Sequence, residues 1–154
     1  MPRRPRNAMT RMEAQAADTK MSPHEWEKAV MGLLRCNGWE FHHERDRAGG
    51  AKNNARKKGF PDFPCFKKFT DWKLIPELLL AATRLDRPGA ISHRFPTITI
   101  HGIIEAKTGS GVPSDKQWEW IWAARNCPGH FGIVVYPTDR AWLIQLLGGN
   151  EPVR

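Results

Sequence analysis

The stretch from Thr97 to Lys107, Thr-Ile-Thr-Ile-His-Gly-Ile-Ile-Glu-Ala-Lys, limits the possible folds of this chain more than any other segment. It is rich in β-branched residues and alternates along its length, as a β-strand does. One set of alternating positions is apolar or small: Ile98, Ile100, Gly102 and Ile104. The pattern predicts a strand in the interior of a sheet.

The last three residues of this strand carry the first chemical signal. Alternate side chains of a strand share a face, so Glu105 and Lys107 are expected to point the same way, with Ala106 directed into the core. A neighbouring carboxylate and ammonium often form only a neutralising surface pair. At the end of an apolar strand, however, charge is costly to bury unless a partner such as a metal ion compensates it.

Two capping boxes predict helices before and after this strand. Ser22-Pro-His-Glu25 has the S-x-x-E form with proline at the first helical position. The first helix is expected to end at Asn37-Gly38. Ser114-Asp-Lys-Gln117 opens the second helix in the same way.

Shorter patterns predict the remaining elements. They are a strand at Trp39–His42, a strand entered from Gly59–Phe63, a helix over Asp71–Leu85, a strand at Gly132–Tyr136, and a helix or strand at Trp142–Leu147. The order of elements predicts an α/β fold, with helices packed around a small central mixed sheet.

Composition and charge restrict the partners of the chain. Its 154 residues fit one domain, and 40% hydrophobic residues with seven Trp predict a folded protein. A net charge of +8 and a pI near 9.8 favour a polyanion, most commonly nucleic acid, with an acidic membrane surface as the alternative. No apolar run approaches the roughly 20 residues that span a bilayer, so no membrane insertion is expected.

The N-terminal segment is expected to be a basic flexible arm over residues 1–20, preceding a single domain over 21–154. It contains four arginines, Arg3, Arg4, Arg6 and Arg11, and no hydrophobic periodicity. The arm either contacts phosphates or is a solvated tail. It lacks the apolar stretch of a secretory signal.

Cysteine usage favours the cytoplasm. Cys36, Cys65 and Cys127 are odd in number, widely spaced and contain no C-x-x-C pair. They are expected to be reduced thiols, and they do not have the spacing of zinc ligands.

A basic segment precedes the second predicted strand. Between residues 44 and 58 it holds Arg45, Arg47, Lys52, Arg56, Lys57 and Lys58. The segment is interpreted as a loop that contacts nucleic-acid phosphates, with a solvated surface as the alternative.

Asp62 supplies a second carboxylate at the start of a strand, directly after Pro61. If Asp62 and Glu105 converge from neighbouring strands, they form an oxygen site suited to Mg²⁺, with the Ala106 carbonyl as a further ligand. Such an ion would polarise a phosphodiester and activate a coordinated water. Lys107 would then orient or deprotonate that water, or stabilise the transition state.

Three segments resemble the virus-type replication-repair nuclease (VRR-NUC) family of the PD-(D/E)XK superfamily, which is common in phages. They are Gly59-Phe-Pro-Asp-Phe, Ile103-Ile-Glu-Ala-Lys-Thr-Gly-Ser-Gly and Val112-Pro-Ser-Asp-Lys-Gln-Trp. The first helix, ending in Asn37-Gly-Trp, and the following His43 also fit the family pattern. The resemblance covers roughly Ser22 to Leu147 and implies a restriction-endonuclease-like core.

The resemblance also implies roles for individual residues. Asp62 and Glu105 would bind Mg²⁺, with Mn²⁺ expected to substitute, Lys107 would be the catalytic lysine, and Gln117 would lie close to the site. The family places a further acidic or amide residue on the first helix. Glu27 is favoured there over Glu25, because Glu25 already serves the capping box. His43 is grouped with the nucleic-acid-binding residues.

The chain departs from the family between its two motifs. A long insertion, over about residues 65–95, stands where relatives need only a hairpin. Its helix is expected either to cover one side of the cleft or to form a homodimer contact.

The predicted function is Mg²⁺-dependent hydrolysis of DNA phosphodiester bonds, directed by DNA structure, in phage replication, recombination or repair. The location would then be the cytoplasm of the bacterial host. RNA remains open as a substrate. The alternative is a non-catalytic basic nucleic-acid-binding protein, which would use Trp118 or Trp120 for stacking. A third interpretation is the same fold without activity, against which the intact Asp62, Glu105 and Lys107 set argues.

Overall fold

The computed structural model describes residues 20–43, 59–85 and 97–152 of the chain. In chain order its elements are α2 (Pro23–Cys36), β1 (Glu40–Phe41), β2 (Phe63–Phe69), the 3-10 helix η1 (Trp72–Leu74), α3 (Glu77–Thr83), β3 (Ile98–Ala106), α4 (Asp115–Asn126), β4 (His130–Val135), the 3-10 helix η2 (Pro137–Asp139) and α5 (Arg140–Leu147). Within these ranges no helix combines the length and the apolar character needed to cross a membrane. Of the arm predicted over residues 1–20, residues 1–19 lie outside them.

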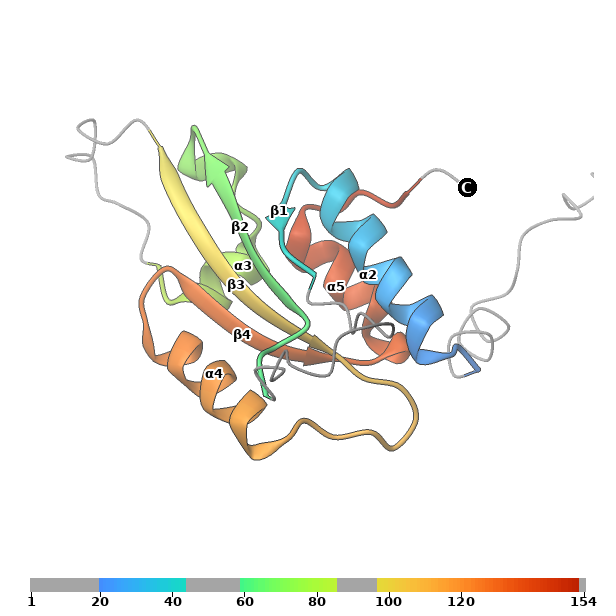
Figure 1. Cartoon of the computed structure of the whole chain (residues 1–154). Helices are drawn as coiled ribbons and strands as arrows, with labels where there is room; N and C mark the ends of the chain where they lie inside the picture. The colour runs from blue at the N-terminus through green and yellow to red at the C-terminus, as the bar shows by residue number, and fades with distance from the viewer. Residues whose placement is uncertain (1–19, 44–58, 86–96, 153–154) are drawn as a thin grey trace, which may run out of the picture.

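The four strands form one mixed sheet in the order β1-β2-β3-β4 (Figure 1). β1 pairs antiparallel with β2, and β2 with β3, while β3 and β4 run parallel. Parallel neighbours need a crossover connection, and α4 supplies it between β3 and β4. β3 is therefore paired on both sides, which confirms the prediction of an interior strand.

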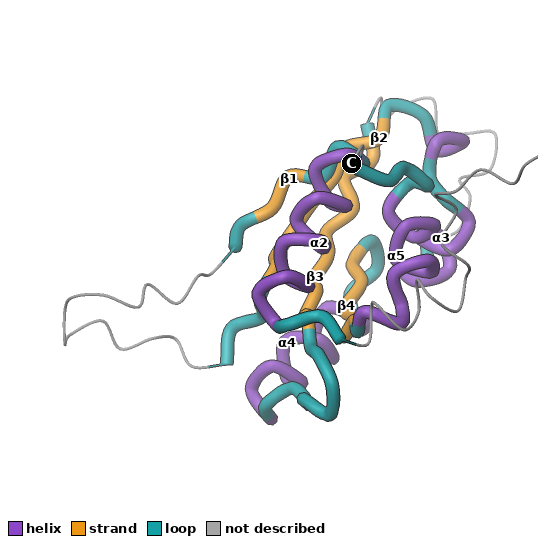
Figure 2. The backbone as a smooth tube through the Cα atoms, turned by 90° about the vertical axis from the view of Figure 1, so that its right-hand side faces the viewer, coloured by secondary structure: helices purple, strands orange, loops and turns teal. Residues whose placement is uncertain are grey.

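The two faces of the sheet are covered by different helices. Figure 2 shows α2 and α5 on one face, with α3 beside α5, and α4 on the other. The face toward α2 and α5 holds the main hydrophobic core, in which Phe63, Ile100 and Ile104 are fully buried. On the opposite face α4 approaches β4 closely at Gly132, where a Cβ would lie 2.4 Å from the Ile121 carbonyl oxygen.

The first helix forms as its capping box predicted. The Ser22 hydroxyl accepts a hydrogen bond from the Glu25 N–H, and the Glu25 carboxylate accepts one from the Ser22 N–H at 2.8 Å. The buried Trp26 donates its indole N–H to the Val135 carbonyl at 3.1 Å. This bond ties the first turn of α2 to the carboxyl end of β4.

The single helix predicted over Asp71–Leu85 is wrong in its extent, because η1 and α3 stand there instead. A proline disfavours helical conformation in the residue before it, and Ile75 is extended, with φ −77° and ψ 122°. Pro76 then caps α3. The chain therefore turns between two short helices where one continuous helix was predicted.

The predicted insertion, about residues 65–95, begins within β2, because the register pairs the whole of Phe63–Phe69 with β3. Its residues 86–95 lie outside the described ones. α3 packs against α5 and β4, and its Thr83 carbonyl accepts a hydrogen bond from the Gly129 N–H at 3.0 Å. Gly129 precedes β4, so the last residue of α3 lies near the end of the sheet away from Val135.

The last element, left open between helix and strand, is the helix α5, and the strand predicted at Gly132–Tyr136 is β4, which begins two residues earlier. The structure thus confirms an α/β fold with a small four-stranded mixed sheet and flanking helices.

Candidate active site

The predicted acidic residues meet where β2 begins and β3 ends. The antiparallel register pairs Phe63 with Ile104, so one step further along Asp62 faces Glu105. Phe63 and Ile104 point into the main core. Because side chains alternate along a strand, Asp62 and Glu105 point to the other face, the one that carries α4.

Two main-chain hydrogen bonds hold the carboxylates together. The Asp62 N–H donates to Glu105 Oε2 at 3.1 Å, and the Ala106 N–H donates to Asp62 Oδ2 at 3.0 Å. Each strand end thus supplies a donor to the carboxylate of the other. The arrangement orients both side chains.

Glu105 is the most unusual titratable group of the site, because its side chain has no exposed surface. Burial raises the pKa of Glu105 to about 7; the hydrogen bond from Lys107 opposes this shift, and the charge of Asp62 adds to it. Two carboxylates in a desolvated site favour the binding of a cation. A cation would offset both the burial of the Glu105 charge and the repulsion between Glu105 and Asp62.

Lys107 lies beside Glu105, as strand alternation predicted. Its Nζ is 2.5 Å from Glu105 Oε1, and 23% of its side chain is exposed. The Lys107 N–H donates to the Val135 carbonyl at 2.9 Å, which anchors the main chain one residue beyond β3. The ammonium is therefore held at the site, and part of the Lys107 side chain faces solvent.

Gln117 both caps α4 and reaches the site. Its Oε1 accepts a hydrogen bond from the Ser114 N–H at 2.9 Å, which completes the predicted capping box. Its Nε2 donates to Glu105 Oε1 at 2.6 Å. The two predicted roles of Gln117, capping α4 and lying close to the site, use different atoms of its amide group.

Pro61 directly precedes Asp62, two residues before the ladder of β2 and β3 begins at Phe63 and Ile104. Continued past this pair, the register would bring residue 61 opposite Ala106. A proline has no N–H, so residue 61 donates no ladder hydrogen bond to the Ala106 carbonyl. This carbonyl is the oxygen that the sequence named as a further ligand.

A close packing contact that the sequence did not reveal positions the segment before Asp62. Gly59 has φ +99°, and a Cβ there would lie 2.2 Å from Lys116 Cβ at the start of α4. Only glycine fits both the conformation and the space. The segment that carries Asp62 is thus packed against the helix that carries Gln117.

The two candidates on α2 form other interactions. The carboxylate of Glu25 accepts hydrogen bonds from the Ser22 N–H and hydroxyl, at 2.8 and 2.7 Å. Glu27 Oε2 lies 3.4 Å from Nε2 of His43, whose ring stacks on Phe63 at 4.8 Å between centroids. His43 thus links α2 to the residue that follows Asp62.

Across the described parts of the chain, no group of three or more His, Cys, Asp or Glu side chains gathers as a metal site. The oxygen donors that do converge are the carboxylates of Asp62 and Glu105, next to the main chain of Ala106. This set fits Mg²⁺, which commonly uses one or two protein carboxylates and fills its remaining positions with water and substrate phosphate.

The predicted phosphate-contacting loop lies outside the described residues, with all six of its basic side chains: Arg45, Arg47, Lys52, Arg56, Lys57 and Lys58. Because residues 43 and 59 border the segment, its two ends adjoin β1 and the Asp62 segment.

Beyond the carboxylates, the sheet face carries aromatic side chains that sequence reasoning missed. Phe66, His101 and His130 lie directly opposite one another on β2, β3 and β4. Their separation in the sequence gives no spacing signal. Trp120, one of the two tryptophans considered for stacking, lies near this face, with its ring centroid 5.1 Å from that of Phe60.

No family model matches the chain, and comparison with curated proteins and with solved structures gives no match either. The functional interpretation therefore depends on the local geometry and on the motifs themselves.

Proposed function

We propose that this protein is a Mg²⁺-dependent nuclease with a restriction-endonuclease-like core, as the resemblance of its motifs to the VRR-NUC family implies. The observation that carries the proposal is the contact between Asp62 and Glu105, which the main-chain hydrogen bonds orient side by side. Lys107 adds an ammonium at 2.5 Å from Glu105. A buried carboxylate with an acidic neighbour and an adjacent amine is a costly arrangement for a purely structural role.

Asp62, Glu105 and the Ala106 carbonyl would hold the ion, and Mn²⁺ is expected to replace Mg²⁺. When bound, the metal supplies Lewis acidity toward a phosphodiester and its attacking water. The negative charge of both carboxylates favours the ion, while the main-chain donors keep the two groups in place. Gln117 restrains Glu105 from the side of α4 through the 2.6 Å hydrogen bond.

Lys107 is the residue of this chain best placed to act on the substrate. Its side chain is partly exposed, and its ammonium can donate to a non-bridging phosphate oxygen or orient the attacking water. Either interaction stabilises the charge that develops during hydrolysis. Its ion pair with Glu105 fixes its position before substrate binds.

The proposed substrate is DNA, cleaved according to its structure during phage replication, recombination or repair. The net charge of +8 supports a polyanionic substrate. A non-catalytic nucleic-acid-binding protein would share this charge, but it has no need for a buried Glu105 between Asp62 and Lys107. The site geometry therefore favours hydrolysis over binding alone.

A panel of labelled linear, branched and single-stranded DNA and RNA substrates with Mg²⁺ or Mn²⁺ tests the proposal. Wild-type protein should cleave at least one DNA substrate. Lys107→Met should reduce the rate by about a hundredfold or more, while affinity for DNA stays within a fewfold. Lys28→Met, at an exposed position on α2, is the matched control and should cleave normally. If pure, folded wild-type protein cleaves none of these substrates, the nuclease proposal is refuted.

A further inference from the structure

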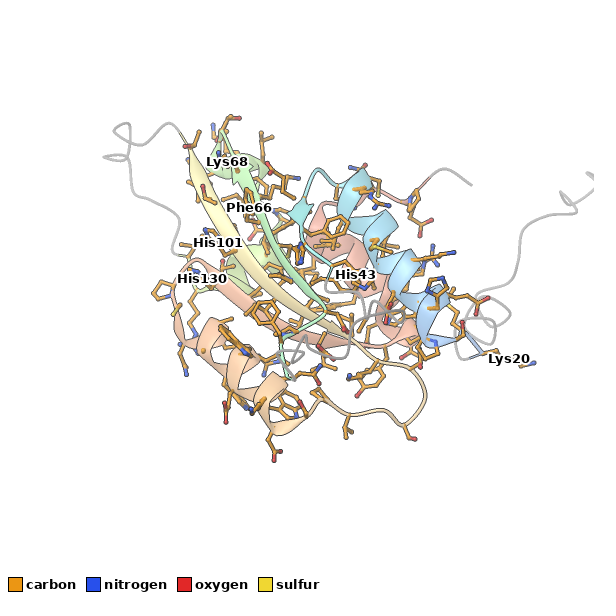
Figure 3. All side chains as sticks on the ribbon, in the orientation of Figure 1. Lys20, His43, Phe66, Lys68, His101 and His130 are labelled. Atoms are coloured by element: carbon orange, nitrogen blue, oxygen red, sulfur yellow. The ribbon has the colours of Figure 1, made fainter. Side chains whose placement is uncertain are left out.

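Three aromatic rings form a row across the sheet on the same face as the candidate active site. The register places Phe66 opposite His101 and His101 opposite His130. The ring centroids of Phe66 and His101 are 6.0 Å apart, and those of His101 and His130 are 4.9 Å apart with an interplanar angle of 15°. Figure 3 shows the three side chains in line across β2, β3 and β4. We call this set the aromatic row.

The aromatic row lies in a groove of about 540 Å³. Phe60 and Trp120 also line this groove, and their rings meet edge to face at 5.1 Å. Trp120 is 45% exposed although it belongs to α4, the helix that covers this face. The groove thus offers flat rings from both the strands and the helix.

The groove continues toward the two carboxylates. Pro64 and Ile103 line it, and they lie between the aromatic row and the Asp62–Glu105 pair on β2 and β3. Phe66 is four residues from Asp62 along one strand, or about 13 Å at 3.3 Å per residue. That distance corresponds to a few nucleotides of a stacked strand.

A lysine lies beside the groove, and a carboxylate lines it. Lys68 follows Phe66 on the same face of β2 and is exposed (Figure 3). His42 lines the groove from the β1 side. Among the described residues that line it, Glu40, opposite Phe66, is the one acidic side chain. Burial and the nearby His130 lower the pKa of His101, which favours the neutral ring and its stacking.

We propose that this groove binds unpaired bases of a DNA single strand and directs the adjoining phosphodiester to the Asp62–Glu105 site. Aromatic rings stack on any base, so the groove would select unpaired DNA without reading its sequence. The inference deepens the proposed nuclease function, because it makes a single-stranded tail or flap the preferred substrate. Binding to the groove itself requires neither metal nor cleavage.

Binding of labelled oligo(dT) in EDTA, followed by fluorescence anisotropy, tests the groove directly. His101→Ser should weaken binding roughly five- to a hundredfold, the range observed for loss of one stacking contact. His101→Tyr restores a ring and should bind within about threefold of wild type. Trp142→Ala, a partly exposed position on α5 in the other helix layer, is the control and should bind normally.

An abasic oligonucleotide separates stacking from attraction to phosphates. It keeps the charges but lacks bases, so wild-type protein should bind it much more weakly than oligo(dT). Equal binding of the two strands, or an unchanged affinity of both His101→Ser and Phe66→Ala, would overturn the inference. Circular dichroism confirms that each variant is folded.

The inference and the nuclease proposal fail separately. If oligo(dT) binds through the aromatic row and the protein cleaves nothing, the nuclease proposal falls and the groove remains. A second outcome concerns the ratio between the cleavage rates of tailed and blunt duplex DNA. If the protein cleaves DNA and His101→Ser does not change this ratio, the groove has no part in substrate choice and the inference falls.

Discussion

Gln117 contacts Glu105 with the half of its side chain that the helix cap leaves free. The amide oxygen accepts from the Ser114 N–H at 2.9 Å, and the amide nitrogen donates to the carboxylate at 2.6 Å. The start of α4 and the end of β3 are therefore joined through one residue. Substitutions at this cap should separate into those that weaken only the helix and those that also disturb the carboxylate.

Gln117→Glu should impair metal binding while preserving the cap. The new carboxylate can still accept from Ser114, but it replaces the donor to Glu105 with a repelling oxygen. Loss of such a supporting hydrogen bond typically costs ten- to a hundredfold in metal affinity. Calorimetric titration with Mn²⁺ measures the change. Ser114→Ala should instead cost about 1 kcal/mol of stability with metal affinity unchanged. If both variants bind Mn²⁺ with equal affinity, Gln117 serves only to cap α4.

Stability of the metal-free protein should fall as the pH rises from about 4.5 to about 7. The pKa of Glu105 is about 7 in the folded protein, against an ordinary value of 4.5, because burial disfavours its charged form. The folded state thus holds a proton that the unfolded chain releases in this range, and stability is lost as that proton leaves. The loss is at most about 3 kcal/mol.

Urea unfolding in EDTA at pH 5 and pH 8 measures this effect. Glu105→Gln should show a smaller difference between the two pH values than wild type, because the titrating group is absent. Glu119→Gln, at an exposed position on α4, should behave as wild type does. If Glu105→Gln keeps the full pH dependence, the loss comes from other groups.

Gly59→Ala should destabilise the segment that carries Asp62. The new methyl group would lie 2.2 Å from Lys116 Cβ, which cannot rotate away, and φ is +99°. Gly109→Ala is a matched control, because its φ is +56° and no atom lies within 4 Å of the added carbon. The control should lose about 1–2 kcal/mol through strain alone. Thermal unfolding should show a larger loss for Gly59→Ala, together with weaker Mn²⁺ binding; similar losses would show that the packing contact matters little.

Neutralising the basic segment should weaken DNA binding and flatten its salt dependence. The change is the quadruple substitution of Lys52, Arg56, Lys57 and Lys58 to Gln. Each lost phosphate contact with duplex DNA should reduce the slope of log K against log salt by about 0.9. Affinity measured at several salt concentrations gives the slope, and an unchanged value would make the segment a solvated surface.

Local sequence was sufficient for the features that depend on neighbouring residues. Both capping boxes, at Ser22 and Ser114, form as predicted, and the alternation of Thr97–Lys107 correctly indicated an interior strand with Glu105 and Lys107 on one side. The break in the helix predicted over Asp71–Leu85 is also a local effect, because Pro76 disfavours helical conformation in Ile75.

The chain's own sequence determined which residues could form a charged site, because the strand pattern placed Glu105 and Lys107 together and the motif containing Asp62 supplied a second carboxylate. Only the tertiary structure decided that Asp62 faces Glu105, that Gln117 reaches it from another element, and that Phe66, His101 and His130 align. The physical reason is that strand register and helix packing set these contacts. Both arise from burial of the whole core, and no local spacing along the chain encodes them.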